Sequence, residues 1–115
     1  MKFTIFTSDS VGERRNCLYP HRMEITDREK LRAAVSFDHV CAEYEGNYRS
    51  ISSFKESDVC VMDVDNDHSD VPSEWITPEN LEAEFGDLNY AIAFSRNNMK
   101  TKEGKSPRPR FHVYF

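Results

Sequence analysis

One short stretch, Asp58 to Asp70 with the sequence DVCVMDVDNDHSD, constrains this chain more than any other. It begins as a continuous apolar run and ends in closely spaced carboxylates. Because the run is short and rich in β-branched residues, we expect Val59 to Met62 to form a strand that is buried on both faces. Side chains alternate between the faces of a strand, so Asp63 and Asp65 should share one face, about 7 Å apart at a rise of ~3.3 Å per residue.

Two carboxylates at the end of a buried strand are unfavourable unless a positive group joins them. A divalent cation that prefers oxygen ligands, Mg²⁺ or Mn²⁺, is the simplest such group, and we predict that Asp63 and Asp65 bind it. Two alternatives stay open. The segment from Asn66 to Asp70 is rich in turn-forming residues and would also suit a solvated turn. The acids also match several ligand positions of a calcium loop, although His68 stands where such a loop needs glycine for its sharp turn.

The length and composition of the chain limit the kind of protein it can be. Its 115 residues fit one domain at most. The hydrophobic fraction of 38% and the charged fraction of 30% indicate a polar but folded chain. No apolar run approaches the ~20 residues that span a bilayer, so we expect no membrane association and a cytoplasmic location. The three cysteines form no CxxC pair, and we expect free thiols.

The charge is distributed unevenly along the chain. The net charge of −5 argues against a protein that simply coats nucleic acid. Between Glu56 and Ser95 there are eleven acidic residues and no Lys or Arg, whereas Arg96 to Arg110 holds six basic residues and one acid. The segment 97–110 also contains Gly and Pro and has few apolar residues, so we expect a basic, flexible loop. An acidic site followed by a basic arm suits a metal ion together with a polyphosphate.

Local signals predict two helices and five strands. One helix is expected to begin at Thr26, which forms a capping-box pattern with Glu29. The other is expected to begin at Thr77, with Pro78 in its first position, and to end at Gly86. The expected strands cover residues 2–7, 38–44, 59–62, 90–94 and 111–115. This order of elements predicts an α+β fold in which two helices lie on one face of a mainly antiparallel sheet.

The pairing of VCVMDVDND with a downstream RPRFHVYF resembles the archaeo-eukaryotic primase superfamily. The chain looks most like the primase or primase-polymerase modules of phages and mobile elements, and the resemblance includes DNDHSDVPSEWITPENL and SRNNMKTKEGKSPRPRFHVYF. It implies an RRM-like catalytic-core sheet. It also implies that Asp63 and Asp65 are catalytic metal ligands and that His112 is a catalytic residue that contacts the incoming nucleotide triphosphate.

The function that this resemblance implies is metal-dependent nucleotidyl transfer of the DNA primase type. Its partners would be a nucleotide triphosphate and a DNA or RNA template. His112 would donate a hydrogen bond to a phosphate oxygen. Four basic residues would hold the triphosphate or the template backbone. These are Arg96, Lys105, Arg108 and Arg110.

The chain departs from the family's pattern in two places. Arg110 stands where the family has a small residue two positions before the His. The sequence also ends three residues after His112, before the strand that carries the family's third metal-binding Asp. We therefore expect residues 1–115 to be a partial, primase-like domain that is inactive alone.

The alternative function belongs to another class. A primase-like scaffold could serve as a non-catalytic binding module, or as an inhibitor of a host nucleic-acid enzyme such as a defence nuclease. The acidic stretch from Glu56 to Asp87 would then present carboxylates where the target expects phosphates. We also expect the strand Phe111 to Phe115 to leave an open edge that pairs with a second copy or with a protein partner.

Overall fold

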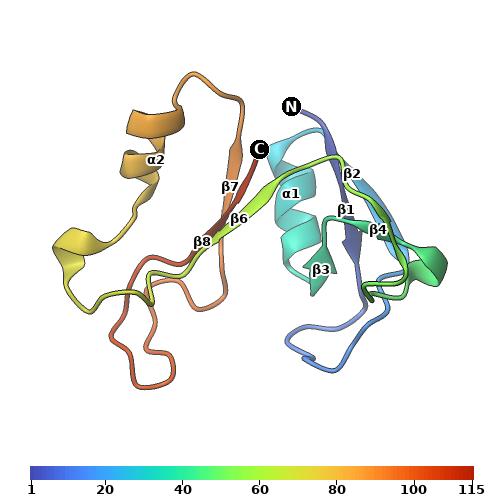
Figure 1. Ribbon diagram of the computed structural model, residues 1–115, viewed down its shortest axis with the longest axis horizontal. Helices are drawn as coiled ribbons and strands as arrows, with labels where there is room; N and C mark the ends of the chain where they lie inside the picture. The colour runs from blue at the N-terminus through green and yellow to red at the C-terminus, as the bar shows by residue number, and fades with distance from the viewer. The chain divides into compact units, whose positions relative to one another are not determined.

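The computed structural model describes every residue from Met1 to Phe115 (Figure 1). All of its strand pairs are antiparallel, and it contains two α-helices, which confirms the predicted α+β class. The chain divides into two compact units, Met1–Cys60 and Val61–Phe115, which are described separately below. Neither helix has the length and apolar character that a membrane span requires.

The first unit holds a three-stranded sheet with the strand order β2-β1-β3 and a two-stranded sheet, β4-β5. The strands are β1 (Phe3–Thr7), β2 (His21–Ile25), β3 (His39–Val40), β4 (Glu43–Tyr44) and β5 (Phe54–Glu56). The predicted strand over 38–44 is therefore two short strands that belong to different sheets, because the chain bends between them. A short 3₁₀ helix, Glu45–Asn47, follows β4.

The first helix is α1 (Arg28–Val35), and its N-cap lies one residue later than predicted. Its N-cap is Asp27, whose carboxylate accepts a hydrogen bond from the Lys30 backbone N–H at 2.9 Å. The capping box predicted at Thr26 is therefore wrong, since Asp27 has a cap-forming side chain in the better position. Leu31 and Ala34 are buried, and α1 packs on β1 and β2.

The second unit holds a three-stranded sheet with the strand order β6-β8-β7 and the second helix. The strands are β6 (Val61–Val64), β7 (Ala91–Phe94) and β8 (Phe111–Tyr114). The helix, α2 (Pro78–Phe85), follows a short 3₁₀ helix, Pro72–Glu74. Its predicted N-cap Thr77 and C-cap Gly86 are both confirmed, and a capping box joins Thr77 to Asn80.

The core of the second unit lies between α2 and one face of the sheet. Leu81 of α2 packs with Val64, Phe111 and Val113, all of which are buried. Phe111 lies opposite Val64 in the β6–β8 ladder, so both point to this face. Residues that alternate with them, including Asp63 and His112, point to the other face.

The structure corrects the predicted position and burial of the strand that precedes the acidic residues. β6 begins two residues later than expected and contains Asp63, which the sequence placed after the strand. Cys60 and Val61 are exposed, and Val64 is the only fully buried residue of β6. The strand is therefore not buried on both faces. Its side chains Met62 and Val64 pack on the face that α2 covers, whereas Val61 on the other face is exposed.

The structure also corrects the expectation of an open C-terminal edge. β8 lies between β6 and β7 and forms backbone ladders with both strands. Its four residues therefore have neighbours on either side. We predicted that this strand pairs with a second copy or a protein partner. That prediction is wrong for β8, because both of its edges are already paired within the chain.

Candidate functional site

Asp63 and His112, the predicted metal ligand and the predicted triphosphate contact, face each other across two strands. They are directly opposite in the antiparallel register of β6 and β8. His112 Nε2 lies 3.3 Å from Asp63 Oδ1, and the side chains are 30% and 65% exposed. The fold thus brings together two residues that are far apart in the sequence, and it leaves both side chains partly exposed to solvent.

Asp65 lies just beyond the end of β6, where the chain turns. Its Oδ1 accepts a hydrogen bond from the Asp67 backbone N–H at 3.0 Å. The residue between them, Asn66, has a left-handed backbone (φ 56) and is buried. The Asn66 side-chain NH₂ group donates hydrogen bonds to the backbone carbonyls of Ile76 and Pro109. Its side-chain oxygen accepts a hydrogen bond from the Ile76 backbone N–H. This turn is therefore a fixed part of the fold and not simply a solvated loop.

The carboxylates of this turn do not form a preassembled metal cage. No group of three or more His, Cys, Asp or Glu side chains in the chain is arranged to hold a metal ion. The calcium-loop alternative fails at its first position, because Asp63 belongs to a paired strand. Joint metal binding by Asp63 and Asp65 stays a prediction.

Arg108, one of the predicted phosphate ligands, is fully buried and directed into the protein. Its guanidinium donates to the backbone carbonyls of Asn66 and Ser69 at 3.0 and 2.8 Å, and to the Asp70 carboxylate at 2.8 Å. It also lies over the ring of Trp75, 5.3 Å from the centroid. Arg108 therefore holds the turn after β6 in place, and its nitrogens are already engaged by protein groups.

Arg110 and Lys105 meet a single carboxylate, that of Asp67. Arg110 Nη1 lies 2.8 Å from Asp67 Oδ1, and Lys105 Nζ lies 3.4 Å from Asp67 Oδ2. Arg110 is buried, whereas Asp67 and Lys105 are partly exposed. Sequence reasoning placed Asp67 in a turn or in a calcium loop and missed its pairing with these two cations. No local signal pairs Asp67 with these cations, because the contact forms only when β8 lies beside β6.

Arg96, the remaining predicted phosphate ligand, follows β7 and is exposed. The segment 97–110 between it and β8 contains backbone hydrogen bonds of its own. Met99 N–H donates to the Arg108 carbonyl at 2.9 Å, and Lys102 and Lys105 exchange backbone hydrogen bonds. The flexibility predicted for this loop stays a prediction, but two of its basic side chains are anchored inside the fold.

The two cations beside Asp67 lower the pKa of its carboxyl group. Burial by itself raises this pKa, but the close contacts and positive charges of Arg110 and Lys105 together outweigh burial and bring it below the usual 3.8. Because the folded-state pKa is the lower one, Asp67 stabilises the fold above its unfolded pKa. That stability is lost as the pH falls through the folded pKa.

We therefore expect the free energy of unfolding to fall more steeply below about pH 4 in the wild type than in an Asp67→Asn variant. The measurement is urea unfolding at a series of pH values between about 2 and 6. Parallel pH profiles for the two proteins would contradict this expectation.

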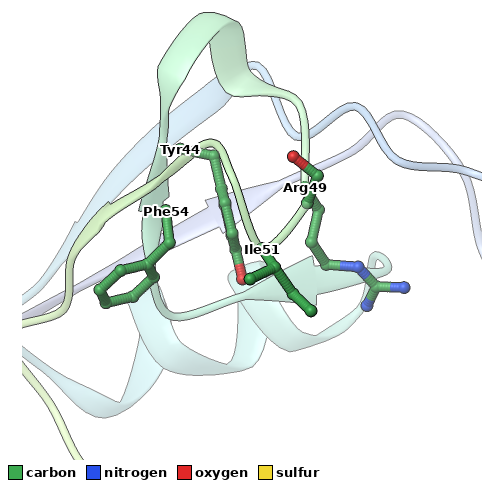
Figure 2. A pocket seen from close by; sticks show the side chains of 5 residues that line it. Tyr44, Arg49, Ile51 and Phe54 are labelled. Carbon is green, nitrogen blue, oxygen red and sulfur yellow. The ribbon is translucent and has the colours of Figure 1, made fainter.

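The first unit has a separate open pocket, which contains none of the predicted site residues. It is lined by Tyr44, Arg49, Ser50, Ile51 and Phe54. Figure 2 shows the Tyr44 ring between the side chains of Phe54 and Ile51, with the Arg49 guanidinium extending away from them. Ile51 is completely exposed, so the lining is loosely packed on that side.

No protein-family model, curated protein or solved structure shows significant similarity to this chain. The relationship to the primase superfamily and the RRM-like character of the sheet therefore stay predictions from the sequence.

Proposed function

We propose that this chain binds a nucleotide triphosphate together with a divalent cation, as the catalytic core of a primase-type nucleotidyltransferase does. The observation that carries the proposal is the Asp63–His112 pair, in which the predicted metal ligand and the predicted triphosphate contact meet at 3.3 Å on one sheet face. A DNA or RNA template is the second partner that this function requires.

The carboxylates at the end of β6 fit Mg²⁺ or Mn²⁺ held in the way proteins usually hold them beside phosphates. Mg²⁺ keeps several waters and is commonly bound through one or two carboxylates plus substrate phosphates, without a complete protein cage. Asp63 is accessible to such an ion, and Asp65 follows two residues later with one oxygen already accepting from Asp67 N–H. When bound, the cation would neutralise phosphate charge and activate an attacking hydroxyl.

His112 supplies a proton donor beside the Asp63 carboxylate. A carboxylate next to an imidazole favours the proton on the nitrogen that faces it, which here is Nε2. The His112 side chain is 30% exposed, so this N–H can turn to a phosphate oxygen. Because two carboxylates hold Mg²⁺ loosely, we expect cation binding to depend on the nucleotide and polymerisation by residues 1–115 alone to be slight.

The test is calorimetric titration of a non-hydrolysable nucleotide triphosphate, with Mg²⁺ and with EDTA. We expect Mg²⁺-dependent binding that an Asp63→Asn variant weakens at least about tenfold, since changes further from a metal already cost ~10–100-fold in affinity. Glu79→Gln is the matched control, because it removes an exposed carboxylate from the first turn of α2.

Equal binding with Mg²⁺ and EDTA, or equal losses in both variants, would contradict the proposal. A parallel nucleotide-incorporation assay with an Asp63→Ala, Asp65→Ala variant measures any catalysis. The alternative of a non-catalytic binding module or nuclease inhibitor stays a prediction, and it gains support if the wild type binds no nucleotide.

A further inference from the structure

The second unit contains a buried guanidinium whose donors its protein partner does not satisfy. Arg110 is only 2% exposed. Its Nε, Nη1 and Nη2 atoms have no protein acceptor in regular hydrogen-bond geometry, although Nη1 forms an ion pair with Asp67. Asp67 Oδ1 is likewise buried without a regular hydrogen bond. Native proteins seldom leave buried polar groups in this state, so each such group needs an explanation.

The contrast with Arg108 shows that the fold can satisfy a buried arginine. Arg108 donates through all three of its nitrogens to backbone and side-chain oxygens. Arg110, two residues later, meets a single carboxylate oxygen. A guanidinium offers five N–H groups in a planar fork, which suits two oxygens of one phosphate side by side. Arg110 therefore retains donors that a phosphate group can accept from.

Lys105 completes the anion-binding geometry. It contacts the other oxygen of the same carboxylate at 3.4 Å, so Asp67 lies between two cations as an anionic ligand would. Asp67 and Lys105 are partly exposed, which makes this side of the cluster the one that solvent reaches. The hydrogen bond from Asp67 N–H to Asp65 ties the turn to the end of β6, beside the proposed nucleotide site.

We propose that Arg110 and Lys105 form a phosphate-binding site and that the Asp67 carboxylate occupies this site as an internal competitor. A phosphate group enters when the Asp67 side chain swings outward, and it accepts two hydrogen bonds from Arg110 and one from Lys105. The inference rests on the proposed function in one respect, which is that the phosphate belongs to the nucleotide triphosphate. It adds a form of regulation, since the Asp67 side chain must leave the two cations before the triphosphate is fully held.

The probe is tripolyphosphate in EDTA, titrated by calorimetry against wild type, Asp67→Asn and Asp70→Asn. We expect weak binding by wild type and binding at least about tenfold tighter by Asp67→Asn, because the competing carboxylate is removed while both cations stay. Asp70→Asn is the matched control. It removes one negative charge from the same loop but from an exposed carboxylate that pairs with Arg108, so we expect a change of less than about twofold.

Two further arms keep the inference open to contradiction. Adding Lys105→Met to Asp67→Asn should remove most of the gain. In wild type, saturating tripolyphosphate should shift the amide resonances of Asp67 and Lys105 more than those of lysines elsewhere, which provides an answer even if Asp67→Asn does not fold. Equal affinities for wild type and Asp67→Asn, an equal gain in Asp70→Asn, or shifts spread over all lysines would overturn the proposal.

The outcomes also separate this inference from the proposed function. The tripolyphosphate titration contains no metal and no nucleoside, so it does not depend on cation binding at Asp63. If Asp67→Asn binds tripolyphosphate more tightly but the wild type shows no Mg²⁺-dependent nucleotide binding, the anion site exists and the proposed function is wrong. If the wild type binds nucleotide with Mg²⁺ but Asp67→Asn does not bind tripolyphosphate more tightly, the proposed function holds and Asp67 has only a structural role.

Discussion

Replacing Phe111 with Ala is expected to lower the free energy of unfolding of the second unit by about 3–5 kcal/mol. Phe111 is completely buried at the centre of the core formed with Val64, Leu81 and Val113. Because it lies on the central strand, its loss leaves a cavity that both neighbouring strands and α2 line. A domain of this kind is stable by only about 5–15 kcal/mol, so the variant should be partly unfolded at moderate temperature.

Phe94→Ala provides the control for Phe111→Ala. Phe94 lies opposite Phe111 in the β7–β8 ladder, and the ring centroids are 6.1 Å apart, but Phe94 is 58% exposed. We expect a loss of about 1 kcal/mol, the order of one aromatic pair. Urea unfolding followed through the fluorescence of Trp75, the one tryptophan of the chain and part of this unit, measures both. Equal losses of unfolding free energy in the two variants would show that burial does not determine how much each ring stabilises the fold.

Replacing Arg108 with Met is expected to cost about 3 kcal/mol or more. The substitution keeps an unbranched side chain but removes the donors to the carbonyls of Asn66 and Ser69. A buried acceptor that loses its partner costs about 1–3 kcal/mol, and here two are affected. The contact with the Trp75 ring is lost as well, so the tryptophan emission should change even under conditions in which the variant folds.

The Asp70→Asn variant separates these hydrogen bonds from the ion pair of Arg108. The Asp70 carboxylate is 86% exposed although its partner is buried, so solvent screens the pair. An ion pair of that kind contributes about 0–1 kcal/mol, and we expect a change within this range. If Asp70→Asn were as destabilising as Arg108→Met, charge pairing would hold the turn after β6, and the backbone carbonyls would be secondary.

The elements that the sequence determined are those with complete local signals. Thr77, Pro78 and Gly86 lie within one short segment and define both ends of α2 without reference to the rest of the chain. The strands β1, β7 and β8 were predicted to within a residue or two at each end, because their apolar runs are bounded by polar or turn residues. The α+β class follows from these elements, since caps and periodicity depend on neighbouring residues alone.

The tertiary structure decided which of these residues are buried and what they meet. The basic segment 97–110 reads as a solvated loop, because no local pattern indicates that an arginine will be buried. The partners of Arg108 and Arg110 come from residues 66–70, about forty positions earlier, and become adjacent only when β8 pairs with β6. The same register sets Asp63 opposite His112. A shift of one residue would turn His112 to the core face, so the site depends on strand pairing that the sequence of neither strand specifies alone.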